Sequence, residues 1–148
     1  MFSGLVNLKS IYLGNNKLQY LHPDTFLGLP NLQNVSFYGN RGLQIPTDRN
    51  FINSHSLSYL GISCCNVNSV SAETFANVSA LKWLNLRYNN LSTVDINILR
   101  ALPELSVRYP YGNPLQRESC RKCGDDVRIV TYGQRLGRES RNVTNRAK

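Results

Sequence analysis

Residues 81–91 read LKWLNLRYNNL, and this segment decides the fold. Leu84 and Leu86 alternate with polar and aromatic residues, which is the pattern of a short strand with one buried face. Leu81 precedes this apolar pair and Asn89 follows it. The same arrangement recurs along the chain, so the segment predicts one unit of a repeat and not an isolated strand.

Three columns of residues share one period, with steps of 24, 25, 24 and 24 residues. Their members are Phe2, Phe26, Phe51, Phe75 and Leu99; Leu8, Leu32, Leu57, Leu81 and Leu105; and Asn16, Asn40, Cys65, Asn89 and Asn113. Between the second and third columns lie the alternating apolar pairs Ile11/Leu13, Val35/Phe37, Leu60/Ile62 and Leu84/Leu86. All three columns place one inserted residue between Asn40 and Phe51, so chance is a poor explanation for the period.

These residues resemble the leucine-rich repeat family, whose pattern is LxxLxLxx(N/C)xL. The period of 24 with a distal Phe is similar to the typical extracellular subclass, as in Toll-like receptors and Slit-like proteins. The resemblance covers residues 2 to about 115 and implies an α/β repeat solenoid, a horseshoe with a short parallel sheet on its concave face. Stacking buries leucines that one repeat could not bury alone. In the family, the Asn side chain bonds to backbone groups of the turn.

The residues that flank each inward pair are expected to face outward on the concave side. The outward positions carry four aromatic residues, whereas Phe37 is the sole aromatic residue among the inward pairs. Tyr, Trp and Arg are enriched in binding hot spots, although strand propensity also favours aromatic residues. The predicted ligand-binding residues are Tyr12, Ser36, Tyr38, Tyr59, Trp83, Asn85, Arg87 and Tyr88.

The leading functional hypothesis is a protein-recognition module, extracellular or at the cell surface, in adhesion, signalling or innate immunity. The alternative is an intracellular scaffold on the same fold. Nothing in the sequence indicates an enzyme, because there is no paired carboxylate site, phosphate loop or nucleophile–base set. The sequence also gives no reason to expect a cofactor, a metal or a specific nucleic acid partner, and it contains no apolar run long enough to span a membrane.

The last repeat departs from the pattern. By strict count, Arg108 and Pro110 would point inward, and proline cannot donate to a central sheet ladder. A one-residue slip would place Val107 and Tyr109 there instead. Either register predicts an irregular final strand at the sheet edge. Ser54 also occupies a position that is normally apolar.

The repeats are predicted to occupy residues 1–115, with the first and last incomplete or irregular, and residues 116–148 to form an altered C-terminal cap and a basic, partly disordered tail. The tail holds nine of the 17 Lys and Arg residues, and the whole chain has a net charge of +8. Cys120 and Cys123 could be free thiols, a disulfide or half a zinc site, and we favour them in that order. Cys65 is interpreted as a small buried residue.

Four N-glycosylation sequons are present, a mild excess over chance that favours secretion weakly. They begin at Asn34, Asn77, Asn90 and Asn142. A glycan on Asn34 would obstruct the concave face. No signal peptide is visible, and Phe2 already stands in the Phe column, so we interpret the sequence as part of a longer protein.

Overall fold

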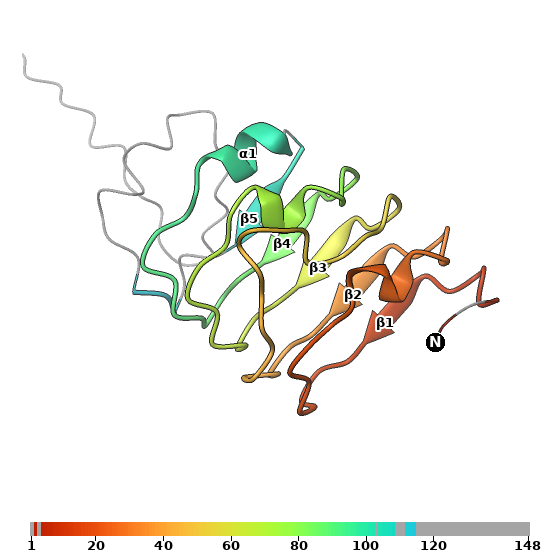
Figure 1. Cartoon of the computed structure of the whole chain (residues 1–148), viewed down its shortest axis with the longest axis horizontal. Coiled ribbons are helices and arrows are strands. Elements are labelled where there is room, and N and C mark those ends of the chain that lie inside the picture. The colour runs from red at the N-terminus through yellow and green to blue at the C-terminus, as the bar shows by residue number, and fades with distance from the viewer. Residues whose placement is uncertain (1, 3, 103, 109–111, 115–148) are drawn as a thin grey trace, which may run out of the picture.

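The computed structural model describes residues 2, 4–102, 104–108 and 112–114. The chain winds as a solenoid, and each turn adds one short strand to a single parallel sheet (Figure 1). The strands are β1 (Ser10–Tyr12), β2 (Asn34–Ser36), β3 (Tyr59–Gly61), β4 (Trp83–Asn85) and β5 (Ser106–Arg108). Predictions for the tail, for the boundary at residue 115, and for Tyr109, Pro110, Cys120, Cys123 and Asn142 fall outside the described residues.

The sheet order is β1-β2-β3-β4-β5, so chain neighbours are also spatial neighbours. Ile11 pairs with Val35, Val35 with Leu60, and Leu60 with Leu84. These partners are the first members of the apolar pairs found in the sequence, so the repeat period is also the register of the sheet. The solenoid fold predicted from the columns is confirmed.

The inward positions form the core. Val35, Leu60 and Leu84 are completely buried, as are the second members Phe37, Ile62 and Leu86. Burying each such side chain contributes roughly 1.5–3 kcal/mol. Every strand is only three residues long, so stacking between repeats, and not strand length, holds the sheet together.

The Phe column forms an aromatic layer behind the leucines. Phe26 lies between Phe2, at a ring-centroid distance of 5.5 Å, and Phe37, at 6.4 Å. Phe37 also contacts Phe51, edge to face, at 5.5 Å. Phe26, Phe51 and Phe75 are buried, so this column fills the side of the solenoid away from the sheet.

The Asn column satisfies backbone groups at the strand ends. The Asn89 side-chain amide donates to the carbonyls of Ile62, at 2.7 Å, and Leu86, at 3.1 Å. Its oxygen accepts from the backbone N–H groups of Cys65, at 2.9 Å, and Val67, at 3.1 Å. Asn89 therefore ties one turn of the solenoid to the preceding turn, as the resemblance implied.

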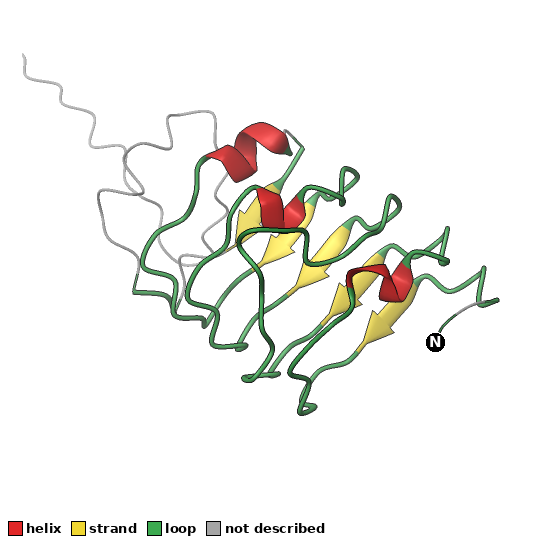
Figure 2. Ribbon diagram, viewed as in Figure 1, coloured by secondary structure: helices red, strands yellow, loops and turns green. Residues whose placement is uncertain are grey.

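Short helices lie on the opposite side of the solenoid from the sheet (Figure 2). They are the 3-10 helices η1 (Pro23–Phe26) and η2 (Glu73–Phe75) and the α-helix α1 (Asn97–Ala101). In η1, Pro23 fits the first turn because its missing N–H is not needed there, and the His22 ring accepts from the Asp24 N–H. Within the described ranges, no helix is both long and apolar enough to cross a membrane.

The final strand takes the slipped register. β5 pairs Val107, and not Arg108, with Leu84, so the step from β4 to β5 is one residue shorter than the 24-residue period. β5 lies at the sheet edge, as predicted, but its three residues pair regularly with β4. The irregularity of the last repeat is therefore the loss of one residue between β4 and β5, and β5 itself is a regular strand.

Candidate functional site

The outward side chains of β1 to β4 and the residues just after the strands form the surface that we call the outer sheet face. Each lies beside a buried inward residue because successive side chains of a strand point to opposite sides. Tyr12 is 74% exposed, Tyr88 52%, Tyr38 47% and Trp83 42%. The other predicted site residues are half-buried: Ser36, Tyr59, Asn85 and Arg87. All eight lie on β1, β2, β3 or β4, or in the turns that follow these strands.

Two tyrosine rings of this face rest against glycines. A side chain added at Gly61 would lie 3.1 Å from the Tyr59 hydroxyl and 3.2 Å from the Ser36 hydroxyl. A side chain at Gly14 would lie 3.6 Å from the Tyr38 ring. The glycines thus leave room for the rings to lie flat along the sheet. Both glycines flank the inward pairs, so the sequence pattern places them on this face. It does not reveal that they make room for the tyrosine rings, because the repeat pattern does not determine how a ring is oriented.

The face contains an open cavity of about 260 Å³. Tyr59 and Trp83 occupy equivalent positions on adjacent strands, and they line the cavity together with Asn85 and the backbone region of buried Leu84. The Asn85 side-chain oxygen accepts from the Arg87 N–H at 3.2 Å, which fixes the orientation of the amide. The arrangement offers two aromatic walls and a positioned polar group.

Tyr88 stands in a left-handed backbone conformation, with φ of 54°. Such a conformation is uncommon for a bulky residue and costs free energy. The Tyr88 ring lies over Gly112, where an added side chain would approach it to 2.5 Å. The turn therefore places the Tyr88 side chain at the edge of the outer sheet face.

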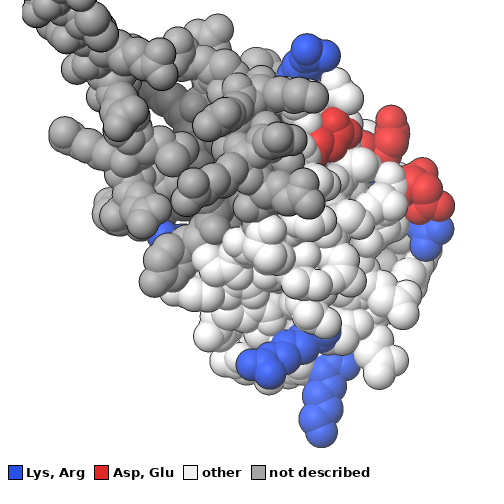
Figure 3. Space-filling model, turned by 90° about the vertical axis from the view of Figure 1, so that its left-hand side faces the viewer, with Lys and Arg blue, Asp and Glu red and all other residues white. Residues whose placement is uncertain are grey.

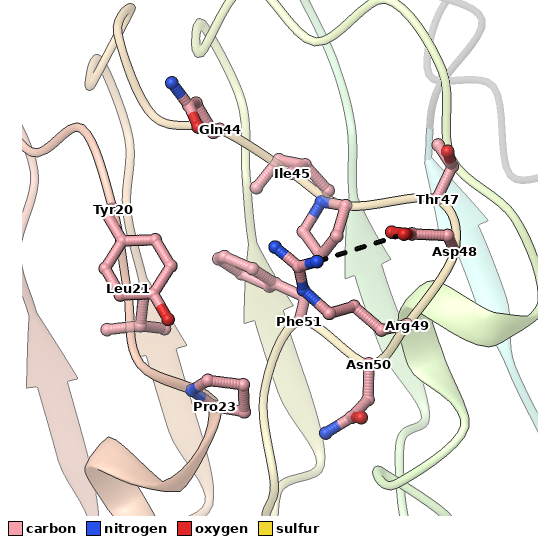
Figure 4. Close-up of a pocket in the computed structure, with 11 residues that line it drawn as sticks. Tyr20, Leu21, Pro23, Gln44, Ile45, Thr47, Asp48, Arg49, Asn50 and Phe51 are labelled. Carbon is pink, nitrogen blue, oxygen red and sulfur yellow. Dashed lines mark ion pairs between the residues drawn. The ribbon is translucent and has the colours of Figure 1, made fainter.

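A second cavity, of about 250 Å³, lies at the inserted residue (Figure 4). Tyr20 and Pro23 form one wall, the loop of residues 44–50 forms the other, and the buried Phe51 lies between them. Arg49 extends across the cavity and lies 3.9 Å from the Asp48 carboxylate. Its lining mixes exposed charges with apolar groups and shows no arrangement of catalytic groups.

Cys64 and Cys65 are free thiols. Cys65 is buried at its place in the Asn column, and its thiol donates to the Phe37 carbonyl at 3.2 Å and the Ser63 carbonyl at 3.3 Å. Burial raises the pKa of the Cys65 thiol above its ordinary value. Cys65 is therefore a structural residue, as interpreted from the sequence, and it takes no part in the outer sheet face.

The fold and this face define a repeat solenoid that presents a rigid, partly aromatic sheet surface. The leucine-rich repeat family model matches residues 1–41 and 55–107, and the chain belongs to this family. The unmatched residues 42–54 contain the insertion and most of the second cavity. Leucine-rich repeats are protein-interaction modules, and neither the family nor the names of the relatives indicate an enzyme.

Three relatives illustrate the similarity. Chaoptin of Tribolium castaneum is 33% identical over 77% of this chain, Toll-like receptor 7 of Mus musculus is 33% identical over 78%, and Toll-like receptor 8 of Homo sapiens is 30% identical over 57%. The chain spans only 14%, 11% and 10% of their respective lengths. The similarity therefore supports an extracellular type of repeat and does not carry over the activity of a whole relative.

Proposed function

We propose that this chain binds a protein ligand through the outer sheet face. The observation that carries the proposal is the contrast between buried aliphatic side chains and exposed aromatic side chains on the same strands. Ile11, Val35, Leu60 and Leu84 are buried, while the neighbouring outward aromatic Tyr12 is 74% exposed and Trp83 is 42% exposed. Large exposed aromatic groups supply contact area with few rotatable bonds, which is why they are common in binding hot spots.

The surface is also preorganised. The leucine core fixes the strands beneath it, and the contacts of Tyr38 with Gly14 and Tyr59 with Gly61 restrict two of the rings. A surface that is already ordered loses less conformational entropy on binding. The four strands of the outer sheet face, at a spacing of about 4.8 Å, span roughly 14 Å, which is enough for part of a protein interface.

The energetic centre is proposed to be Trp83, Tyr59, Arg87 and Tyr38. These residues lie on or directly after β2, β3 and β4, which are the inner strands of the sheet. A partner is first identified by an interaction screen against displayed extracellular proteins. The Trp83→Ala variant should then lose about 2 kcal/mol of binding free energy, or about thirtyfold in affinity, in a titration.

Two matched variants test the location of the site. Tyr20→Ala removes an exposed tyrosine that lines the second cavity, and Asn77→Ala alters an exposed residue away from the strands. Both should bind as tightly as the parent chain, with folding checked by circular dichroism. If Trp83→Ala binds normally while either of these variants loses affinity, the ligand binds away from the sheet and the proposal is wrong.

We further propose an extracellular or cell-surface location. Two relatives are named as receptors, and Asn77 and Asn90 place two sequons at exposed positions. Asn34 is half-buried on β2, where its amide donates to the Ser10 hydroxyl at 3.1 Å, so a glycan there would compete with this bond. A shift in mass of the natively produced protein after glycosidase treatment supports this location, whereas unmodified protein in the cytosolic fraction supports the intracellular scaffold.

A further inference from the structure

Charge is segregated along each repeat. We define a strand segment as the residues from just before a strand to just after the Asn column: 9–17, 33–41, 58–66 and 82–90. These segments contain five basic residues and no acidic one: Lys9, Lys17, Arg41, Lys82 and Arg87. Between residues 18 and 105, the connecting segments hold five acidic residues and two basic ones: Asp24, Asp48, Glu73, Asp95 and Glu104, with Arg49 and Arg100. The sheet side is therefore cationic and the helical side is net acidic.

The cations border the outer sheet face on two rims. Lys9 and Lys82 directly precede β1 and β4, while Lys17 and Arg41 follow the Asn column in successive repeats. All four are exposed. Among the described residues, the ion pairs are His22–Asp24 and Asp48–Arg49, and neither includes a rim cation. Figure 3 shows acidic side chains gathered at the upper right, where some basic side chains also lie, and other basic side chains projecting from the lower edge.

The spacing of the rim cations suits separate carboxylates. Lys17 and Arg41 hold the same position in adjacent repeats, so their backbones lie about 5 Å apart, whereas Lys9 and Lys82 are three strands apart, about 14 Å. Between the rims lie the uncharged Ser36 and Asn85 and the cavity walled by Tyr59 and Trp83. Positive charges around such a surface attract a negatively charged partner and repel a positively charged one.

We propose that the ligand of the outer sheet face is an acidic protein segment that places Asp or Glu side chains at the two rims and an aromatic or aliphatic side chain in the cavity between Tyr59 and Trp83. This inference rests on the proposed function and specifies its partner. It favours protein over nucleic acid because four of the five cations form two separated rims, and Arg87 is the one cation on the outer sheet face itself. A polyphosphate strand is held best by many contacts along a continuous basic track.

The first experiment selects peptides from a random 16-residue phage library on the full chain. The selected peptides should be acidic and should contain an aromatic or large aliphatic residue. Their dissociation constants are then measured by fluorescence anisotropy, and affinity should fall when salt is raised from about 50 mM to about 500 mM, because salt screens exposed charges. A 15-residue single-stranded oligonucleotide serves as the nucleic acid probe.

Two double variants carry the same change in net charge at different places. Lys9→Glu with Lys82→Glu reverses one rim, whereas Arg49→Glu with Arg100→Glu reverses the two exposed cations of the connecting segments. The rim variant should weaken the acidic peptides by about tenfold or more, and the other should change their affinity by less than about twofold. Circular dichroism and thermal melting confirm that both variants fold.

Other outcomes would contradict either the acidic ligand and its position at the rims or the proposed function. Equal losses in both double variants mean that net charge alone attracts the peptide, and tighter, rim-dependent binding of the oligonucleotide makes the ligand a nucleic acid. Selected peptides that are neutral or basic, yet lose affinity with Trp83→Ala, contradict the acidic ligand and leave the proposed function standing. A failed selection, or peptides insensitive to Trp83→Ala, counts against the proposed function itself.

Discussion

Five residues in the turns after the strands share a left-handed backbone conformation. They are Asn15, Gly39, Cys64, Tyr88 and Gly112, with φ between 53° and 76°. They recur with the same steps as the Asn column, one residue earlier. Glycine and asparagine tolerate this conformation, whereas Cys and Tyr are strained in it. The turn thus requires the conformation in every repeat, and only some repeats hold a residue suited to it.

Gly39→Ala should destabilise the chain by about 1–3 kcal/mol. Its φ of 76° disfavours any side chain, and an added methyl group would clash with the Asn15 side-chain oxygen. Gly28→Ala is the matched control, because nothing lies within 4 Å of its added methyl group, and it should change stability by less than about 0.5 kcal/mol. Urea denaturation measures both. Equal midpoints for the two variants would contradict the assigned turn geometry.

Asn89→Ala should cost about 3 kcal/mol in the free energy of unfolding. The substitution leaves the buried backbone groups of Ile62, Leu86, Cys65 and Val67 without their side-chain partner, and unsatisfied buried groups are costly.

The control for Asn89→Ala is Asn16→Ala. Asn16 belongs to the same column but is exposed, and its side-chain amide donates to the carbonyls of Leu13 and Gly14 within its own repeat. It should therefore cost less than about 1 kcal/mol in the same denaturation assay. A cost for Asn16→Ala that matched that of Asn89→Ala would show that burial does not set the contribution of the column.

At the residue scale, the sequence identifies the residues that every repeat needs for core packing and for hydrogen bonds to the backbone of the turn. Buried leucines such as Leu84 and the amide of Asn89 follow from period and residue type alone. The contacts of Tyr38 with Gly14 and Tyr59 with Gly61 do not follow, because they depend on the rotamers of the tyrosine side chains. The outward residues were therefore found by alternation, whereas the cavity between them was not.

At the scale of the elements, the two departures from the period have different consequences. The insertion before Phe51 is visible in the sequence, and in the structure the loop of residues 44–50 that contains this region lines the second cavity. The shortened step before β5 places Val107 opposite Leu84. A strict step would have paired Arg108 with Leu84 instead. Sequence reasoning limited the register to two choices and could not decide between them.

Leu84→Ala tests the assignment of buried and exposed residues at β4. Leu84 is completely buried in β4 between its partners on β3 and β5, so its truncation should cost about 2–5 kcal/mol. Lys82→Ala alters the exposed residue two positions earlier and should change stability by less than about 0.5 kcal/mol. Guanidinium denaturation followed by Trp83 fluorescence compares them, and coincident curves would refute the assignment.

At the scale of the whole molecule, the solenoid is a linear stack in which each repeat contacts only its neighbours. The sheet follows the chain order, so in the described part of the chain β3 has two strands on each side, whereas β1 pairs with β2 alone. Stability in such an array is close to a sum of repeat and neighbour contributions. The interior of the sheet should therefore open less often than its first strand, and the proposed binding centre lies in that interior.

Three equivalent backbone bonds allow this idea to be tested without differences in local geometry. The N–H groups of Leu13, Phe37 and Ile62 donate to carbonyls of the next repeat, each at 2.8 Å. Native-state hydrogen exchange should show the lowest protection at Leu13 and the highest at Ile62, by about tenfold or more, which corresponds to about 1.4 kcal/mol. Because bond length and position in the repeat are matched, the difference reports the place of each strand in the stack. Equal protection at all three sites would mean that the repeats unfold as one cooperative unit, and the stepwise description would then be wrong.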